Sequence, residues 1–295
     1  MPRLLVASLA MSDAGKTTAA RSAIRVLLGR GLRVSPFKPA GEFWLYKDWP
    51  NVARALGEGR LYGNDAYLLC REAGSPFPEE TISPALRLVA PARHDHKGEY
   101  CPTIAARCTM GGDPARHVLA LDRRRIAGLG LERHFEKLAS SDGVTVYDFS
   151  SLQELNLMVA KYLPDSIAQA HRRILAEYDN VVYESSGFSA MPWLGLNQFD
   201  YVVAVNHGYL QLYDGPLYRE NFIATQEIDL DSNWAKDHEP REHAVWKNFS
   251  LIRTSQVVEK QKVLAEVAIP PLLPSMIDAG FDEAMTSLLE SLAVS

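Results

Sequence analysis

Residues 4–27 read LLVASLAMSDAGKTTAARSAIRVL, and this stretch decides the fold that we expect. It opens with a short apolar run, Leu4–Ala7, which has the length of a buried strand. The chain then turns through residues 8–14 and enters Gly15-Lys16-Thr17-Thr18. Apolar residues recur after this point among arginines, with the spacing of a helix that packs on a sheet. Strand, loop, glycine-lysine-threonine and helix form the context that a phosphate-binding loop requires.

The chemistry of such a loop follows from its backbone. Free N–H groups at the start of a helix point at a polyphosphate, Lys16 adds a positive charge, and the Thr17 hydroxyl can reach a bound Mg²⁺. The common pattern has a glycine where this chain has Ala10, so a helix start with a solvated lysine is the alternative. The nucleotide-binding residues that we predict are Ser12, Asp13, Ala14, Gly15, Lys16, Thr17 and Thr18.

The composition limits the classes of protein that are possible. The chain has 295 residues, of which 47% are hydrophobic and 23% charged, and its net charge is -5. This charge argues against nucleic acid held by a basic surface. No apolar run approaches the roughly 20 residues that span a bilayer, and the first apolar run is too short for a secretion signal. Three cysteines provide no disulfide framework. We therefore expect a cytoplasmic protein without a membrane or nucleic-acid partner.

The segment after the first helix predicts a second strand on the same sheet. Gly29-Arg30-Gly31 supplies a helix stop, and residues 32–37 read as a strand. Strand, helix and strand joined by a short crossover should be parallel and right-handed. Lys38 would then lie at the same edge as the phosphate-binding loop, where ligands of open α/β sheets bind. A solvated lysine in a turn is the alternative.

Two motifs carry a resemblance to a known family. Residues 12–18, SDAGKTT, and residues 36–39, PFKP, resemble the start of the cobyric acid synthase and dethiobiotin synthetase group of ATP-dependent enzymes. Dethiobiotin synthetases also commonly lack the first glycine of the loop. The resemblance implies a P-loop NTPase of the α/β class, with a mostly parallel sheet and helices on both faces. We expect one such domain over residues 1–295.

The same resemblance implies two carboxylates for a metal ion. Residues 64–66, NDA, begin a predicted helix and resemble a segment that supplies a metal ligand, which here is Asp65. Residues 175–187, LAEYDNVVYESSG, resemble a strand that ends in a metal-directed acid, which here is Glu184. The alternatives are a helix-start residue for Asp65 and a structural acid for Glu184. Thr254 falls where relatives recognise the adenine base.

The middle of the chain departs from the family pattern. Residues 91–143 are interpreted as an insertion that faces substrate or a partner. His94, Asp95, His96, Cys101, Cys108 and His117 lie in or near it, but their spacing matches no common metal motif. Further strands are predicted at residues 144–149, 181–183, 201–205, 249–253 and 263–269. Helices are predicted at residues 166–178 and at the C-terminal end of the chain.

The function that these features predict is ATP- and Mg²⁺-dependent activation of a small carboxylate or carbamate by phosphoryl transfer. Lys16 and Lys38 are the predicted catalytic residues, and Thr17, Asp65 and Glu184 are the predicted Mg²⁺ ligands. The alternatives are a regulatory or assembly ATPase without ligase chemistry, and a dethiobiotin synthetase proper, against which the insertion and Ser185-Ser186 argue. No cysteine lies in a glutaminase G-x-C-x-G turn, so glutamine-dependent chemistry would need a separate glutaminase subunit. From the resemblance we also expect a homodimer with a small-molecule acceptor.

Overall fold

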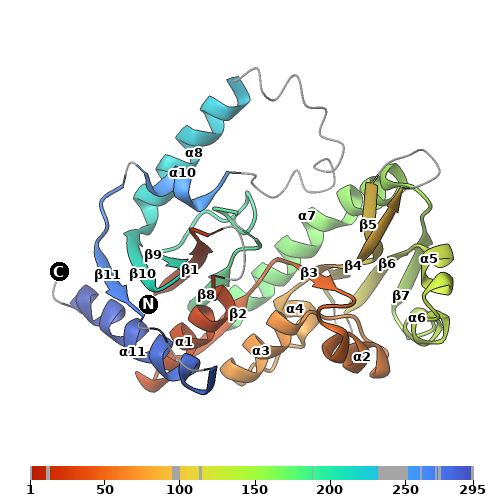
Figure 1. Ribbon diagram of the computed structural model, residues 1–295, viewed down its shortest axis with the longest axis horizontal. Helices are drawn as coiled ribbons and strands as arrows, with labels where there is room; N and C mark the ends of the chain where they lie inside the picture. The colour runs from red at the N-terminus through yellow and green to blue at the C-terminus, as the bar shows by residue number, and fades with distance from the viewer. Residues whose placement is uncertain are drawn as a thin grey trace.

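The chain is an α/β protein with two β-sheets, as a computed structural model shows (Figure 1). The structure describes residues 2–10, 14–94, 100–112, 115–187, 189–231, 252–259, 261–269, 271 and 274–293. Within these ranges, no helix combines the length and the apolar character that a membrane crossing requires. The two sheets lie side by side in Figure 1, with one long helix, α7 (Leu152–Glu177), between them.

The first sheet, sheet A, has the strand order β11-β10-β9-β1-β8-β2. Its strands are β1 (Arg3–Ser8), β2 (Val34–Phe37), β8 (Asn180–Glu184), β9 (Tyr201–Asn206), β10 (Tyr209–Asp214) and β11 (Ala265–Ala268). The four strands from β9 to β2 are parallel, and β10 and β11 add antiparallel pairs at one edge. Leu5 of β1 lies opposite Tyr183 and Val202. Because both faces of β1 are covered, its sequence is a continuous apolar run rather than an alternating one.

Helices cover both faces of sheet A. Successive side chains of β1 enter different cores: Leu4 and Val6 pack with residues of α1 (Lys16–Gly29) and α11 (Ile277–Glu290), whereas Leu5 and Ala7 pack with residues of α7. This division follows from the alternation of side chains along a strand. The remaining helices near this sheet are α3 (Asn64–Ala73), α8 (Gly215–Asp231) and α10 (Thr254–Val258), with short 3₁₀ turns η2 (Pro274–Met276) and η3 (Ser291–Ala293).

The second sheet, sheet B, has the order β3-β4-β5-β6-β7. Its strands are β3 (Ala40–Trp44), β4 (Ala85–His94), β5 (Tyr100–Met110), β6 (Arg116–Leu121) and β7 (Val144–Asp148). The central pairs are antiparallel, and the outer pairs β3–β4 and β6–β7 are parallel. The associated helices are α2 (Trp49–Gly57), α4 (Glu79–Ile82), α5 (Arg123–Gly128) and α6 (Glu132–Ala139). Residues 91–143 thus supply parts of a sheet whose first strand begins at Ala40.

One apolar core joins the two sheets. The cluster that contains Ile167 and Ile174 of α7 also contains Val181 of sheet A and Ala106 and Val118 of sheet B. The Ser166 hydroxyl donates a hydrogen bond to the Pro84 carbonyl at 3.1 Å, which fixes α7 against the start of β4. Helix α7 therefore packs against both sheets.

Several predicted elements are confirmed, and others need correction. The predicted parallel strands β1 and β2 are parallel, but β8 lies between them. Helix α7 begins at Leu152 rather than at Ser166, and it contains Pro164. Of the strand predicted at residues 249–253, only Ile252 and Arg253 are described, and Arg253 forms an isolated bridge with Ser189.

Candidate functional site

The candidate site lies at one edge of sheet A, where three parallel strands end. Because β1, β2 and β8 are parallel, their carboxyl ends meet at the same edge. The loop to α1 follows β1, Lys38 follows β2, and Glu184 is the last residue of β8. The start of α3 brings Asp65 to the same place.

The start of α1 has the backbone of an anion-binding helix. Gly15 precedes the helix with φ of 88°, in the left-handed region, and a Cβ at this position would lie 2.9 Å from Cζ of Phe281. Glycine is therefore required for both conformation and space. No side chain caps this helix at Gly15, and the N–H groups of the first turn of a helix are the groups that bind anions. Ala14 is buried and Lys16 to Thr18 are half-buried, whereas Ser12 and Asp13 lie outside the described residues.

Four predicted site residues meet in one charged cluster. Lys38 Nζ donates to Asp65 Oδ2 at 2.5 Å and to Glu184 Oε1 at 2.6 Å. The Thr17 hydroxyl donates to the same Glu184 oxygen at 2.9 Å. The lysine and Glu184 are buried, while the Asp65 side chain is 39% exposed. These residues come from four separate segments, so the fold and not local sequence assembles the cluster.

The charges of the cluster are strongly coupled. Burial raises the pKa of Glu184, and the charge of Lys38 only partly opposes this effect. Burial acts in the same direction on Asp65, but the Lys38 charge and the hydrogen bonds from Lys38 and Thr17 hold its pKa below the usual value. Burial tends to lower the pKa of Lys38, yet the two carboxylates outweigh it and raise that pKa. Lys38 is therefore a permanently charged ammonium at neutral pH.

The oxygen atoms of the cluster fit a hard divalent cation. Within the described part of the chain, no donor reaches Oε2 of Glu184, although this atom is buried. A buried carboxylate oxygen without a partner is costly, and a cation would satisfy it. Mg²⁺ is usually held by one or two carboxylates together with phosphate oxygens and water. Thr17, Asp65 and Glu184 are donors of this type.

Other metal arrangements find no support in the described ranges. There, no group of three or more His, Cys, Asp or Glu side chains is arranged to hold a metal ion alone. Cys101 and Cys108 are buried in the core. Nδ1 of His117 lies 3.1 Å from the hydroxyl of Thr109. Asp95 and His96 lie outside the described residues.

A cavity of about 560 Å³ contains the cluster. One wall comes from the start of α1, and Lys16, Thr17, Lys38, Asp65 and Glu184 all line the cavity. The other lining residues are Ala14, Gly15, Thr18, Gly41, Glu42, Phe43, Trp44, Lys47, Asp48, Gly63, Asn64, Ala66, Ser83, Leu86, Ser186 and Gly187. The sequence analysis missed the contribution of β3 and the turn that follows it. The high density of aromatic residues in residues 43–49, FWLYKDW, could have indicated that this segment contributes to a ligand cavity.

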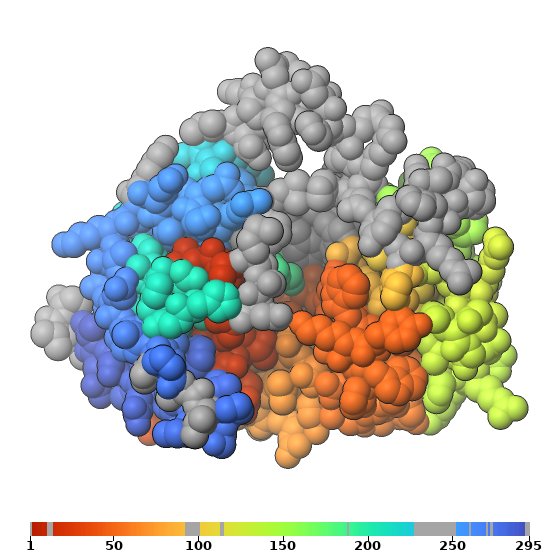
Figure 2. All heavy atoms as spheres, in the orientation of Figure 1, coloured from red at the N-terminus to blue at the C-terminus, as the bar shows by residue number. Residues whose placement is uncertain are grey.

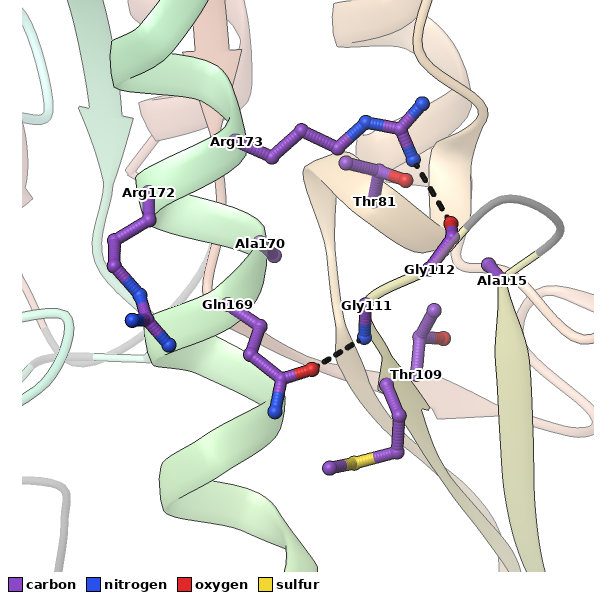
Figure 3. Close-up of a pocket in the computed structure, with 10 residues that line it drawn as sticks. Thr81, Thr109, Gly111, Gly112, Ala115, Gln169, Ala170, Arg172 and Arg173 are labelled. Atoms are coloured by element: carbon purple, nitrogen blue, oxygen red, sulfur yellow. Dashed lines mark hydrogen bonds between the residues drawn. The ribbon is translucent and has the colours of Figure 1, made fainter.

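A second cavity, between α7 and the β5–β6 end of sheet B, has a different character (Figure 3). Its volume is about 440 Å³, and it contains none of the predicted site residues and no acid. Gly111 N donates to Gln169 Oε1 at 2.6 Å, and Arg173 reaches the Gly112 carbonyl at 3.5 Å (Figure 3). Arg173 also lies over the Phe77 ring. Of these two cavities, only the first therefore contains the predicted site residues and their carboxylates.

Thr254 is separate from the cluster. It begins α10, is completely buried, and does not line the cavity that contains Lys16. The structure thus brings together the loop residues from Ala14 to Thr18, Lys38, Asp65 and Glu184, but not Thr254.

Comparison with known proteins gives no match among protein-family models, curated proteins or solved structures. The functional argument therefore depends on the geometry of the cavity.

Proposed function

We propose that the protein is a P-loop NTPase that uses ATP and Mg²⁺ to activate a carboxylate or carbamate, in the manner of the cobyric acid synthase and dethiobiotin synthetase group. The observation that supports this function best is the meeting of Thr17, Lys38, Asp65 and Glu184 beside the N-terminus of α1. A cytoplasmic location agrees with ATP as the substrate.

The start of α1 binds the phosphates in this proposal. The amides of its first turn and the Lys16 ammonium stabilise the charge on the transferring phosphoryl group. Thr17, Asp65 and Oε2 of Glu184 would hold Mg²⁺, and the ion would supply positive charge beside the phosphate oxygens. Thr18 lies in the same first turn and completes the polar wall of the cavity.

Lys38 acts as an electrostatic residue rather than as an acid or base, because its pKa is raised. It has to release at least one carboxylate when Mg²⁺ binds, and its ammonium then faces the acceptor. An acceptor oxygen forms a bond to the γ-phosphorus while the bond from this phosphorus to the ADP oxygen breaks. The nitrogen of an amine then forms a bond to the carbonyl carbon of the resulting acyl phosphate while the bond from this carbon to the phosphate oxygen breaks. Inorganic phosphate leaves, and the nitrogen loses a proton to solvent.

The first experiment tests the loop. Lys16→Ala should abolish ATP binding measured by calorimetry, because the lysine contributes much of the charge that faces the phosphates. Unchanged affinity in a folded Lys16→Ala protein would show that nucleotide binds elsewhere or not at all.

The second experiment separates chemistry from binding. Glu184→Gln keeps the shape of the side chain and deletes its charge, so acceptor-dependent ATP turnover should fall by about two orders of magnitude. ATP affinity should change by less than about tenfold, since loop amides and Lys16 supply most of it. Glu266→Gln is the matched control, because Glu266 is exposed on β11 and contacts Gln211.

Two results would change the assignment. Normal turnover in Glu184→Gln would place the metal ion elsewhere. A wild-type protein without turnover on any carboxylate, whose assembly nevertheless changes with ATP, would be a regulatory ATPase. We also propose a homodimer, which light scattering at micromolar concentration tests directly.

A further inference from the structure

One part of the cavity lining has a composition that phosphate binding does not explain. It consists of Gly41–Trp44, Lys47 and Asp48, from β3 and the turn after it, and we call it the Trp44 wall. Figure 2 shows the orange surface that follows β3 and the red N-terminal surface next to each other on one face of the molecule. The Trp44 wall belongs to sheet B, whereas the phosphate-facing wall belongs to sheet A.

Trp44 is the large apolar group of this wall. Both Phe43 and Trp44 line the cavity, but side chains of β3 alternate, so Phe43 is buried in the core of sheet B while Trp44 is 43% exposed. Glu42, which shares the face of Trp44, forms an ion pair with Arg87 on the neighbouring strand. An uncovered indole in a ligand cavity offers a flat apolar surface to a ligand.

The backbone under Trp44 is fixed before any ligand binds. Trp44 N donates to Asp48 Oδ2 at 3.1 Å, and Asp48 N donates to the Trp44 carbonyl at 2.9 Å. Leu45 N donates to the Val89 carbonyl at 2.8 Å, which ties the turn to β4. A ligand on the indole would therefore not have to order this segment, which lowers the entropic cost of binding.

Lys38 and Trp44 lie on either side of most of strand β3 and line the same cavity. Lys38 lies two residues before β3 begins, and its N–H donates to the Ile82 carbonyl. Trp44 is the last residue of this strand. Four steps along an extended strand cover about 13 Å between the Cα atoms of Ala40 and Trp44. Lys38 and Trp44 line the same cavity, so an elongated molecule can contact the Lys38 ammonium and the Trp44 side chain at once.

We propose that the Trp44 wall binds the acceptor, and that the acceptor is an elongated carboxylic acid with a flat or apolar far end. Its carboxylate lies at Lys38, and its far end packs on the indole of Trp44. This inference rests on the proposed function. In an in-line transfer the acceptor approaches the γ-phosphorus from the side opposite ADP, so an acceptor at Lys38 and the adenine base occupy opposite ends of the site.

The test uses ω-phenylalkanoates of increasing chain length, from phenylacetate to 6-phenylhexanoate, with acetate and hexanoate as references. The longer phenyl acids should raise ATP turnover of the wild-type protein and quench tryptophan fluorescence, and acetate should do neither. Trp44→Leu should raise the KM for the best acid by about tenfold or more, with kcat and ATP affinity within about threefold of wild type. Trp49→Leu should behave as wild type, because Trp49 is equally exposed but is not a lining residue.

Each other outcome has a definite meaning. An unchanged KM in a folded Trp44→Leu protein, or acetate as effective as the long phenyl acids, overturns the inference. So does a tenfold loss of ATP affinity in Trp44→Leu, which would make the indole the base-stacking surface. If the acids bind to the protein with ADP and Mg²⁺, in a Trp44-dependent way, but never raise turnover, then the acceptor subsite stands and the proposed reaction fails.

Discussion

Arg107→Met is a direct test of how sheet B supports the site. Arg107 lies on β5, is only 2% exposed, and donates to three backbone carbonyl groups. Nε reaches the Leu61 carbonyl at 2.7 Å, Nη2 the Ser83 carbonyl at 2.7 Å, and Nη1 the Pro84 carbonyl at 3.2 Å. Leu61 shortly precedes α3, which carries Asp65, and Ser83 lines the cavity. The guanidinium thus holds two segments that shape the site.

The expected loss follows from these contacts. A buried acceptor without a donor costs about 1–3 kcal/mol. Arg107→Met removes the described donor of the Leu61 and Ser83 carbonyls, whereas the Pro84 carbonyl still accepts from Ser166 and from Thr109 N, so the loss is roughly 2–6 kcal/mol. Part of this cost is offset, because methionine does not carry a buried charge. Burial lowers the pKa of Arg107 to about 10, which shows that the cation is not fully compensated. We expect the free energy of unfolding to fall by about 2–4 kcal/mol.

Urea unfolding of wild type and Arg107→Met measures this change, and turnover measured under native conditions should fall with it. Arg123→Met is the control, because Arg123 forms a largely exposed ion pair with Asp148 and should cost less than about 1 kcal/mol. An Arg107→Met protein as stable as wild type would refute the view that these carbonyls depend on the guanidinium.

The remaining predictions concern metal, loop and pH. Lys38→Met removes the ammonium that bonds both acids, so the Mg²⁺ affinity of the nucleotide-free protein, measured by calorimetry, should be higher than in wild type. Equal Mg²⁺ affinity in the two proteins would count against a metal site at these acids. Gly15→Ala places a Cβ against Phe281 at positive φ and should weaken ATP binding by about tenfold, while unchanged affinity would show that the loop adapts. Burial lowers the pKa of His171 to about 4, from 6.5 when unfolded, so this group lowers stability as pH falls from about 6.5 toward 4. Between pH 7 and pH 5, the free energy of unfolding measured in urea should therefore fall by about 2 kcal/mol less in His171→Gln than in wild type. An equal fall in both proteins would contradict a buried neutral imidazole.

The sequence predicts sheet A well because its strands are buried on both faces. β1, β8 and β9 are continuous apolar runs, and helix α1 follows its loop as expected. The four residues of the charged cluster were also predicted, but their contacts were not. Lys38 was expected to face the acceptor, and in the structure it bonds the two predicted metal ligands. Contacts between segments 27 and 146 residues apart are not visible in local patterns.

In sheet B the strand predicted at residues 144–149 is confirmed as β7, whereas the other strands were not predicted, for physical reasons. β4 and β5 contain Pro91 and Pro102, and β5 also carries the buried Arg107, so neither reads as a regular apolar strand. Their pairing has register shifts after Leu88, which removes a simple alternation. Pro164 similarly conceals the first half of α7, because proline usually ends or kinks a helix.

The strand order of sheet A has a consequence for how the chain folds. β1 and β2 are made first, but they are not neighbours, and β8 must enter between them. β8 follows all of sheet B in the sequence, so the N-terminal strands have no partner until residue 184 exists. β4, β5 and β6 instead pair with their neighbours in the chain, and such local pairings form fastest. We therefore expect sheet B to form before the edge of sheet A that carries the charged cluster, because this edge needs β8 to bring Glu184 to Lys38.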